Sequence, residues 1–258
     1  MSTILWDDIT FGPIHSRRVG TSLGINLMPA NGKICSFDCV YCECGWNKDG
    51  RKNLVIPSYA QVAAALEKKF KEVHGHGIKV DSISFTGNGE PTLHPDFPKI
   101  IDCTIALRDK HLHGAEISVF SNATRIGDAA VREALMKVEN PILKLDAAFN
   151  DLAKRINQPQ GPYDVAEIVE NMKLFDGNFI MQTMFLKGVV PAGSVDNTTA
   201  ENAEAWREIV LALRPRKVMA YSFERETPSP GLVKATVEEM TAIAAPLMEQ
   251  GIDVQINA

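Results

Sequence analysis

The sequence predicts an α/β fold in which six strand–helix units build a parallel sheet covered by helices. Short apolar, β-branched runs alternate with helix-period segments through most of the 258 residues. Helix-capping residues stand ahead of several of the helical segments. No Pro/Ser-rich linker or charged block divides the chain. We therefore expect one domain over residues 1–258, with right-handed crossovers between parallel strands.

The expected elements follow one another in strict alternation. A short first strand at residues 23–27 leads into a loop, and a helix begins after Ser58, which forms a capping-box pair with Gln61. Further strands are expected at residues 81–86, 117–120, 142–149, 179–186 and 218–223. The helices that follow them are expected near Pro95, over residues 128–137, and after the capping residues Asp164, Thr198 and Thr236. A last strand, at residues 252–256, closes the sequence.

Composition and charge exclude several classes of protein. The chain is 45% hydrophobic with a net charge of −5, and no apolar run approaches the roughly 20 residues that span a bilayer. The N-terminus lacks the basic and apolar regions of a signal peptide, so we expect a cytoplasmic protein without a membrane partner. The net negative charge argues against a protein that binds nucleic acid over its whole surface. Five cysteines, three of them within eight residues, favour a metal site in a reducing compartment.

One predicted strand places two charges on the same face. Alternation with a period of two puts Lys144 and Asp146 together, opposite Leu143 and Leu145. Charges that face the interior of a parallel sheet must be paired or must contact a polar ligand. The segment therefore predicts either a structural ion pair or ligand-binding groups.

The clustered cysteines are Cys35, Cys39 and Cys42, in a loop after the first strand. Thiolates are ligands for iron–sulfur clusters, zinc or copper(I). Closed zinc sites and ferredoxin-type clusters use four ligands. Cys44 follows Cys42 so closely that it is poorly placed to be the fourth. Three ligands and one open position indicate a cluster with an iron left for a substrate or cofactor, and a zinc site or a non-catalytic iron–sulfur protein remains the alternative.

The three-then-two spacing, with Tyr41 directly before the third cysteine, resembles the signature of radical S-adenosylmethionine (SAM) enzymes. The resemblance implies a partial (β/α)6 barrel. It also implies a [4Fe-4S] cluster held by Cys35, Cys39 and Cys42 in a cluster-binding loop at residues 31–57, with residues 1–22 as an N-terminal extension. S-Adenosylmethionine would bind at the open iron.

A second motif stands where that family carries a glycine–glutamate motif. Gly87, Asn88, Gly89 and Glu90 follow the second predicted strand, and the resemblance implies that they bind the amino group of S-adenosylmethionine. This chain has Asn88 between the glycines, where many members have consecutive glycines. The family architecture further implies cofactor contacts near the carboxyl ends of later strands, from Ser121, Asn122, Lys144, Asp146 and Gln182.

Residues 11–26 resemble the subgroup that includes wyosine-forming tRNA enzymes and bacterial iron–sulfur oxidoreductases. Arg17 and Arg18 in this stretch, and Arg225 after the sixth strand, are candidates for contact with substrate. Salt bridges that brace the barrel are the alternative for the first two arginines.

The resemblance implies an enzyme that cleaves S-adenosylmethionine reductively and abstracts a hydrogen atom from its substrate. The electron would come from a low-potential donor such as flavodoxin or ferredoxin. We expect a small-molecule or protein substrate, because the chain is acidic and has no cysteine before Cys35, unlike the wyosine-forming enzymes. Modification of tRNA is the alternative.

Overall fold

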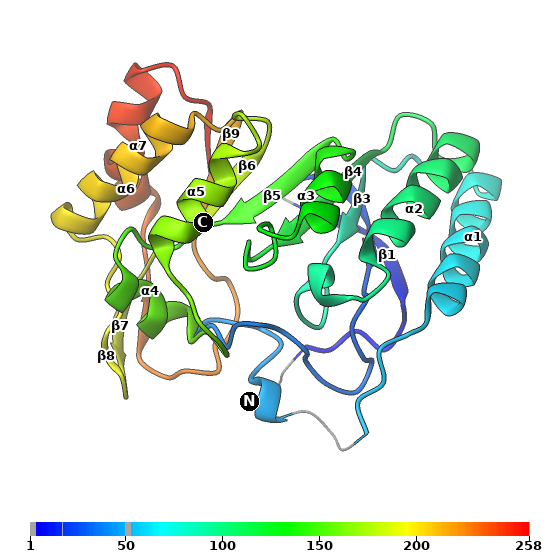
Figure 1. Ribbon diagram of the computed structural model, residues 1–258, viewed down its shortest axis with the longest axis horizontal. Coiled ribbons are helices and arrows are strands. Elements are labelled where there is room, and N and C mark those ends of the chain that lie inside the picture. The colour runs from blue at the N-terminus through cyan, green and yellow to red at the C-terminus, as the bar shows by residue number, and fades with distance from the viewer. Residues whose placement is uncertain (1–3, 17, 50–52, 258) are drawn as a thin grey trace.

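The computed structural model describes residues 4–16, 18–49 and 53–257. Its central feature is a curled, eight-stranded sheet that carries helices on its outer side (Figure 1). The strand order is β1-β2-β3-β4-β5-β6-β9-β11. The strands from β2 to β11 are parallel to their neighbours, whereas β1 and β2 form an antiparallel hairpin. Because β1 and β11 are the two edges of the sheet, the barrel is partial.

The strands of this sheet are β1 (Thr10–Ser16), β2 (Gly20–Ile25), β3 (Ser82–Phe85), β4 (Glu116–Ser121), β5 (Asn140–Lys144), β6 (Ile180–Met184), β9 (Lys217–Tyr221) and β11 (Val254–Asn257). The helices are α1 (Tyr59–Gly75), α2 (Phe97–His111), α3 (Ala129–Met136), α4 (Asn150–Asn157), α5 (Val165–Lys173), α6 (Ala200–Leu213) and α7 (Val237–Glu249), with short 3-10 turns η1 (Asn47–Asp49) and η2 (Pro91–Leu93). A small antiparallel sheet joins β7 (Leu186–Val190) to β8 (Gly193–Ser194) and β10 (Leu232–Lys234). The six strand–helix units and the C-terminal strand are confirmed.

Helix capping agrees with the sequence at three of the four predicted sites. Ser58 and Thr236 form full capping boxes, and the carboxylate of Asp164 accepts from the backbone N–H of Ala166. The predicted cap at Thr198 is wrong, because Thr199 caps α6. The hydroxyl of Thr198 instead donates to Asp196 at 2.7 Å.

Three differences from the prediction go beyond a shift of a few residues at the end of an element. Residues 1–22 were expected as an extension, yet β1 lies among them and is an edge strand of the main sheet. Its register shifts between Phe11 and Ile14, which breaks the two-residue alternation that marks a strand. The strand expected over residues 142–149 ends at Lys144. Helix α4 follows it and was not predicted, because no side-chain cap marks its first residue. The strand expected over residues 179–186 is divided between β6 and β7.

The two faces of the sheet have different partners. On β3, Ile83 and Phe85 are fully buried, and the ring of Phe85 meets that of Phe97 from α2 edge-on at 6.3 Å. The alternate residues of β3 turn their hydroxyls into the curl of the sheet. There, hydrogen bonds link four buried serines of β2, β3 and β4 into a hydroxyl ladder, in the order Ser22, Ser84, Ser82 and Ser118.

A small apolar cluster fills the inside of the curl beside this ladder. Ile142, Ile180 and Met219, from β5, β6 and β9, pack together with Val19 and Phe120 around them. Polar side chains stand nearer the carboxyl ends of the same strands, including Lys144 and Gln182. The interior therefore has an apolar floor, and the polar groups of the site lie above it.

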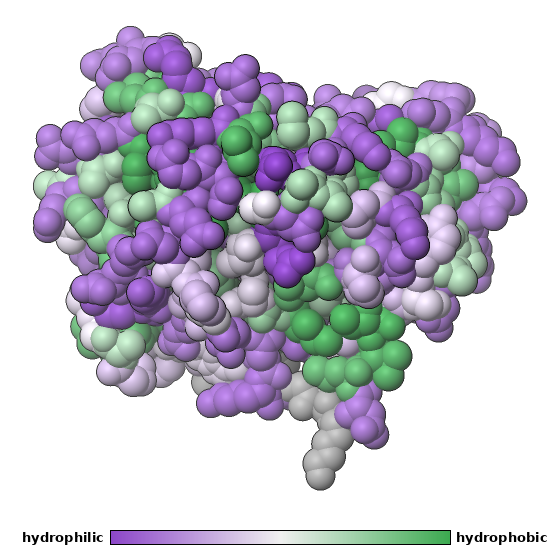
Figure 2. Space-filling view, viewed as in Figure 1, coloured by the Kyte–Doolittle hydropathy of each residue, from purple (hydrophilic) through white to green (hydrophobic). Residues whose placement is uncertain are grey.

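The face of the molecule in Figure 2 is covered mainly by hydrophilic side chains. Within the three described ranges, none of the helices combines the length and the hydropathy that crossing a bilayer requires.

Candidate active site

The cysteine loop leaves β2 and passes below the strands before the chain enters α1 (Figure 1). Cys35, Cys39 and Cys42 are all unpaired thiols. Backbone hydrogen bonds fasten this loop to α4 and to the residue after it: Val40 N donates to Ile156 O at 2.9 Å, and Asp38 N donates to Gln158 O at 3.1 Å. Residues 50–52, in the second half of the expected cluster-binding loop, lie outside the described residues.

The start of the cysteine loop pairs directly with the Gly–Asn–Gly–Glu turn. Ile34 N donates to Asn88 O at 3.0 Å, and Glu90 N donates to Ile34 O at 3.1 Å. A Cβ on Gly89 would stand 1.8 Å from Ile34 O, and Gly89 has a φ of +147°. This position therefore requires glycine, because the cysteine loop approaches the turn there.

A buried lysine lies next to the three thiols. Lys33, 2% exposed, donates to Asp38 Oδ1 and to Gly45 O, each at 3.0 Å. Burial opposes its charged form, yet nearby Cys42, Cys35 and Cys39 together with Asp38 raise the pKa of Lys33. The ammonium is thus placed to balance negative charge on the thiols.

Cys44 interacts with the third cysteine of the motif. Its thiol donates to Gly87 O at 3.2 Å, and hydrogen bonding with Cys44 lowers the pKa of Cys42 to about 6. Burial raises the pKa of Cys35 to about 12. Cys42 is therefore the member of the trio that ionises most readily.

The predicted pair on the fourth strand is confirmed, and it belongs to a buried network around Cys39. Lys144 Nζ lies 3.4 Å from Asp146 Oδ2 and donates to Cys39 Sγ at 2.9 Å. Asp146 Oδ2 accepts from the Tyr41 hydroxyl at 2.5 Å and from Asn157 Nδ2 at 2.6 Å. Lys144 and Asp146 therefore hold the cysteine loop against the sheet.

A second network surrounds Glu90, which is 2% exposed. Its Oε1 accepts from the backbone and hydroxyl of Thr92 and from the Ser121 hydroxyl, and its Oε2 accepts from Asn122 N at 2.7 Å. Burial raises the pKa of Glu90, and these hydrogen bonds oppose that rise. Asn122 Nδ2 also reaches Cys35 Sγ at 3.5 Å. Since Oε1 already has three donors, Oε2 keeps the acceptor capacity for a ligand ammonium.

Asn88 is fully buried and ties the N-terminal segment to the turn. Its Oδ1 accepts from Trp6 N at 2.8 Å, and its Nδ2 donates to Trp6 O at 2.9 Å and to Pro29 O at 2.8 Å. The side-chain amide is therefore engaged within the protein, which explains why asparagine stands between the two glycines.

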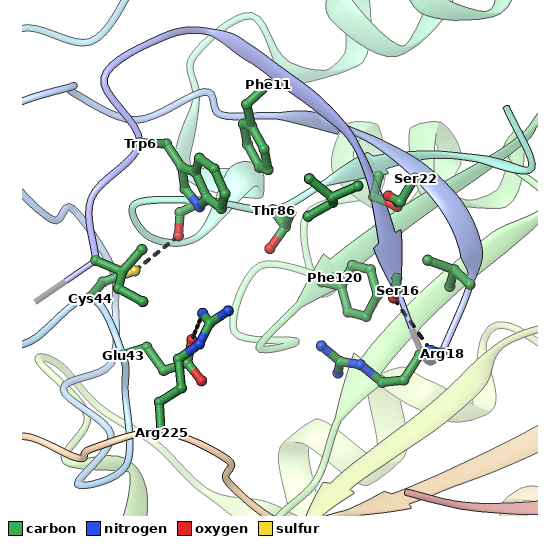
Figure 3. A pocket seen from close by; sticks show the side chains of 15 residues that line it. Trp6, Phe11, Ser16, Arg18, Ser22, Glu43, Cys44, Thr86, Phe120 and Arg225 are labelled. Atoms are coloured by element: carbon green, nitrogen blue, oxygen red, sulfur yellow. Dashed lines mark hydrogen bonds and ion pairs between the residues drawn. The ribbon is translucent and has the colours of Figure 1, made fainter. Parts of the chain in front are cut away.

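Two adjoining cavities, of about 220 and 490 Å³, open between the cysteine loop, the β1–β2 hairpin and the end of β9. They share five lining residues and are called here the mouth cavity; the shared residues are Ile14, Ser16, Arg18, Glu43 and Arg225. Figure 3 shows Arg18 and Arg225 reaching into the smaller cavity from different sides, with Cys44 and Thr86 on its wall. Arg17 lies outside the described residues.

The predicted site residues thus fall into three groups. Glu90, Ser121 and Asn122 meet at Cys35, whereas Tyr41, Lys144 and Asp146 meet at Cys39. Gln182 is the register partner of Lys144 on the neighbouring strand, and its side chain accepts from Arg18 Nη1 at 3.4 Å. Sequence reasoning missed Lys33 and Asn157. Lys33 had a signal in its place two residues before Cys35, but Asn157 lies on the helix that was not predicted.

The donor set fits a [4Fe-4S] cluster held by three cysteines. Lys33 lies close to the three thiols, yet among the described residues no three His, Cys, Asp or Glu side chains are placed to hold a single metal ion. Cysteine thiolates are the ligands that such a cluster takes, and a cation beside them suits their negative charge.

Comparisons with known proteins point in the same direction. A family profile described as "Radical SAM superfamily" matches residues 32–191. The chain is 32% identical over 214 residues to UPF0026 protein slr1464 of Synechocystis, covering 81% of this chain and 72% of that protein. It is 28% identical over 251 residues to the GTPase Obg of Brachyspira hyodysenteriae, covering 96% of this chain but 34% of that protein, so it spans about a third of that relative.

The fold resembles the crystal structure of a radical SAM methyltransferase from Sphaerobacter thermophilus, with a TM-score of 0.66 and 14% identity. The likeness covers 91% of this chain and 65% of that one, and it supports the shared fold.

Proposed function

Because the chain belongs to the radical SAM superfamily, whose enzymes use a [4Fe-4S] cluster and S-adenosylmethionine, we propose that Cys35, Cys39 and Cys42 hold that cluster. We further propose that S-adenosylmethionine binds beside Glu90, and that the enzyme abstracts a hydrogen atom from a small-molecule or protein substrate at the mouth cavity. When both groups are bound, they supply one electron and a sulfonium whose reductive cleavage gives a 5′-deoxyadenosyl radical.

The observation that carries this proposal is the pairing of Ile34 with the Gly–Asn–Gly–Glu turn. Two backbone hydrogen bonds join Ile34 to this turn, where Ile34 and Gly89 form a parallel bridge. Cys35 is the next residue after Ile34, so the cysteine loop lies close to Glu90. A cofactor that contacted both the cysteine loop and Glu90 would need these two segments side by side. The requirement for glycine at position 89 shows how closely they approach.

The surrounding residues have defined tasks in this proposal. Lys33 and Lys144 offset the negative charge of thiolate ligands, which stabilises that charge in a buried site. Glu90 accepts a hydrogen bond from the cofactor ammonium at Oε2, with Ser121 and Asn122 fixing its carboxylate. The segment around Trp6 and the β1–β2 hairpin line the mouth cavity and limit the access of water.

The electron donor in this proposal is a reduced flavodoxin or ferredoxin. We favour a small-molecule or protein substrate over tRNA because the chain carries a net charge of −5. A phosphate backbone is bound through many cations, which an acidic chain is poorly equipped to supply.

Anaerobic reconstitution with iron and sulfide tests the proposal. We expect about four iron atoms per chain, a change in the spectrum of the reduced cluster on addition of S-adenosylmethionine, and formation of 5′-deoxyadenosine with dithionite. Binding of one zinc per chain without iron uptake would overturn it. Iron uptake without any response to S-adenosylmethionine would instead indicate a non-catalytic iron–sulfur protein.

A further inference from the structure

Arg18 is a cation placed inside the mouth cavity between two aromatic rings. Its guanidinium carbon lies 4.8 Å from the centre of the Phe120 ring and 4.9 Å from that of Tyr221. These rings come from β4 and β9, so the guanidinium is inserted between distant strands of the curled sheet. Flat aromatic faces orient a guanidinium and leave its edge N–H groups available for hydrogen bonding.

Among the described residues, the N–H groups at the edge of the Arg18 guanidinium have few hydrogen-bond partners. Its Nη1 donates to Gln182 Oε1 at 3.4 Å, which is a long hydrogen bond. Among the described residues, no carboxylate forms an ion pair with Arg18. A cation that lines a cavity and is not paired with a carboxylate favours an anionic guest, because binding replaces lost hydration with charge-assisted hydrogen bonds.

Arg225 supplies a second cation across the same cavity (Figure 3). It follows β9, and its Nη1 donates to Glu43 Oε2 at 2.8 Å. The side chains of this pair are 58% and 37% exposed, so their ion pair is weak and readily exchanged. Arg225 can therefore leave Glu43 for a guest anion, whereas Phe120 and Tyr221 hold Arg18 in place.

We propose that the mouth cavity recognises its substrate through an oxyanion, a carboxylate or phosphate of a small molecule, bound by Arg18 and reinforced by Arg225. This inference rests on the proposed function and names the substrate class of that site. The oxyanion lies over the apolar floor formed by Ile142, Ile180 and Met219. The part of the substrate that reacts then extends from it toward Cys44 and Thr86, which line the same cavity.

The test uses the reconstituted holoenzyme with S-adenosylmethionine present and two probe anions, inorganic phosphate and ¹³C-labelled succinate. Binding is followed by ³¹P or ¹³C line broadening for the wild type and for Arg18→Gln, Arg18→Lys and Arg225→Gln. Arg216→Gln is the matched control, because Arg216 precedes β9 at the opposite end of that strand and donates to Glu139 O. The affinity for S-adenosylmethionine and its cleavage by dithionite are measured in parallel.

We expect at least one probe to bind the wild type, and the tighter probe identifies the oxyanion as a phosphate or a carboxylate. Arg18→Gln should weaken that binding roughly tenfold to a hundredfold. Arg18→Lys should retain part of it, Arg225→Gln should cause a smaller loss, and Arg216→Gln should cause none. Cofactor affinity and cleavage should stay within about twofold of the wild type.

Three results would overturn this inference. The first is a wild type that binds neither probe, and the second is unchanged probe binding in the folded Arg18→Gln and Arg18→Lys variants. The third is a parallel loss of cofactor affinity in both variants, which would assign Arg18 to the carboxylate of S-adenosylmethionine. A failure of the proposed function is distinct from all three, because the wild type would then take up no iron or would not cleave the cofactor.

Discussion

Lys144, at the end of β5, donates a hydrogen bond of 2.9 Å to the thiol of Cys39, 105 residues earlier in the chain. The contact joins the parallel sheet to the cysteine loop at a buried position. The same ammonium lies 4.6 Å from the centre of the Phe37 ring, which belongs to that loop. Sheet and loop are therefore coupled through one cation.

Lys144→Met should destabilise the protein without cluster by about 3 kcal/mol, because it leaves Asp146 buried without its cation. Urea unfolding measures the change, with the exposed Lys154→Met on α4 as the control. Equal stability of the two variants would mean that Asp146 is satisfied by Tyr41 and Asn157 alone.

Alanine at Cys35, Cys39 or Cys42 should each abolish the cluster, whereas Cys44→Ala and Cys103→Ala should retain about four irons per chain after reconstitution. The reason is that a cluster with three ligands has no spare thiolate. Iron analysis and the visible absorption of the cluster provide the measurement. If Cys44→Ala lost iron while Cys42→Ala kept it, our ligand assignment would be wrong.

Asn88→Ala should release the N-terminal segment from the Gly–Asn–Gly–Glu turn. The change removes three hydrogen bonds of a buried amide, and we expect a loss of about 2 kcal/mol. Hydrogen–deuterium exchange should accelerate at Trp6, whose N–H has Asn88 Oδ1 as its acceptor. Unchanged protection at Trp6 would show that stacking of its ring on Phe11 suffices to hold the segment.

Glu139 should give the protein a stability that depends on pH. Its carboxylate accepts from Ile117 N and from Arg108 Nη1, each at 2.9 Å. Partial burial opposes the charged form, yet these donors lower the pKa of Glu139 below its usual 4.5. A carboxyl with a lowered pKa stabilises the fold above its unfolded pKa and loses that effect as the pH falls through its folded pKa.

Glu139→Gln should therefore cost about 1 kcal/mol at pH 7, a figure reduced for solvent screening because the side chain is 37% exposed. The difference from the wild type should shrink as the pH falls below about 5. Urea unfolding at pH 7, 5 and 4 measures it. A difference that stays constant over this range would assign the effect to packing.

Bulk tRNA should bind weakly, with an affinity that changes little between two salt concentrations. Contacts to several phosphates would instead give a steep fall of affinity with salt. Filter binding with the wild type and with the Arg17→Ala/Arg18→Ala variant makes the comparison. Tight, salt-sensitive binding that the double variant loses would favour the tRNA-modifying alternative.

The sequence predicts the parts of this site that depend on local spacing. The cysteine spacing, the Gly–Asn–Gly–Glu turn and the shared face of Lys144 and Asp146 can all be found within a few residues. Asn88 was expected at the cofactor, but its partner Trp6 is 82 residues away, and no local pattern indicates that contact. The setting of Arg18 is also non-local, because Phe120 and Tyr221 meet it only once the sheet curls.

The hydroxyl ladder of Ser22, Ser84, Ser82 and Ser118 gives the cavity wall a fixed polarity at its open end. Ser22 donates its hydroxyl proton to Ser84, and at the far end Ser118 accepts both from Ser82 and from Asn140 Nδ2. Ser22 lines the mouth cavity, and because its proton is directed at Ser84, it offers a guest a lone pair. The serine wall therefore favours a guest that donates a hydrogen bond there, and selection for negative charge rests with Arg18, which can only donate.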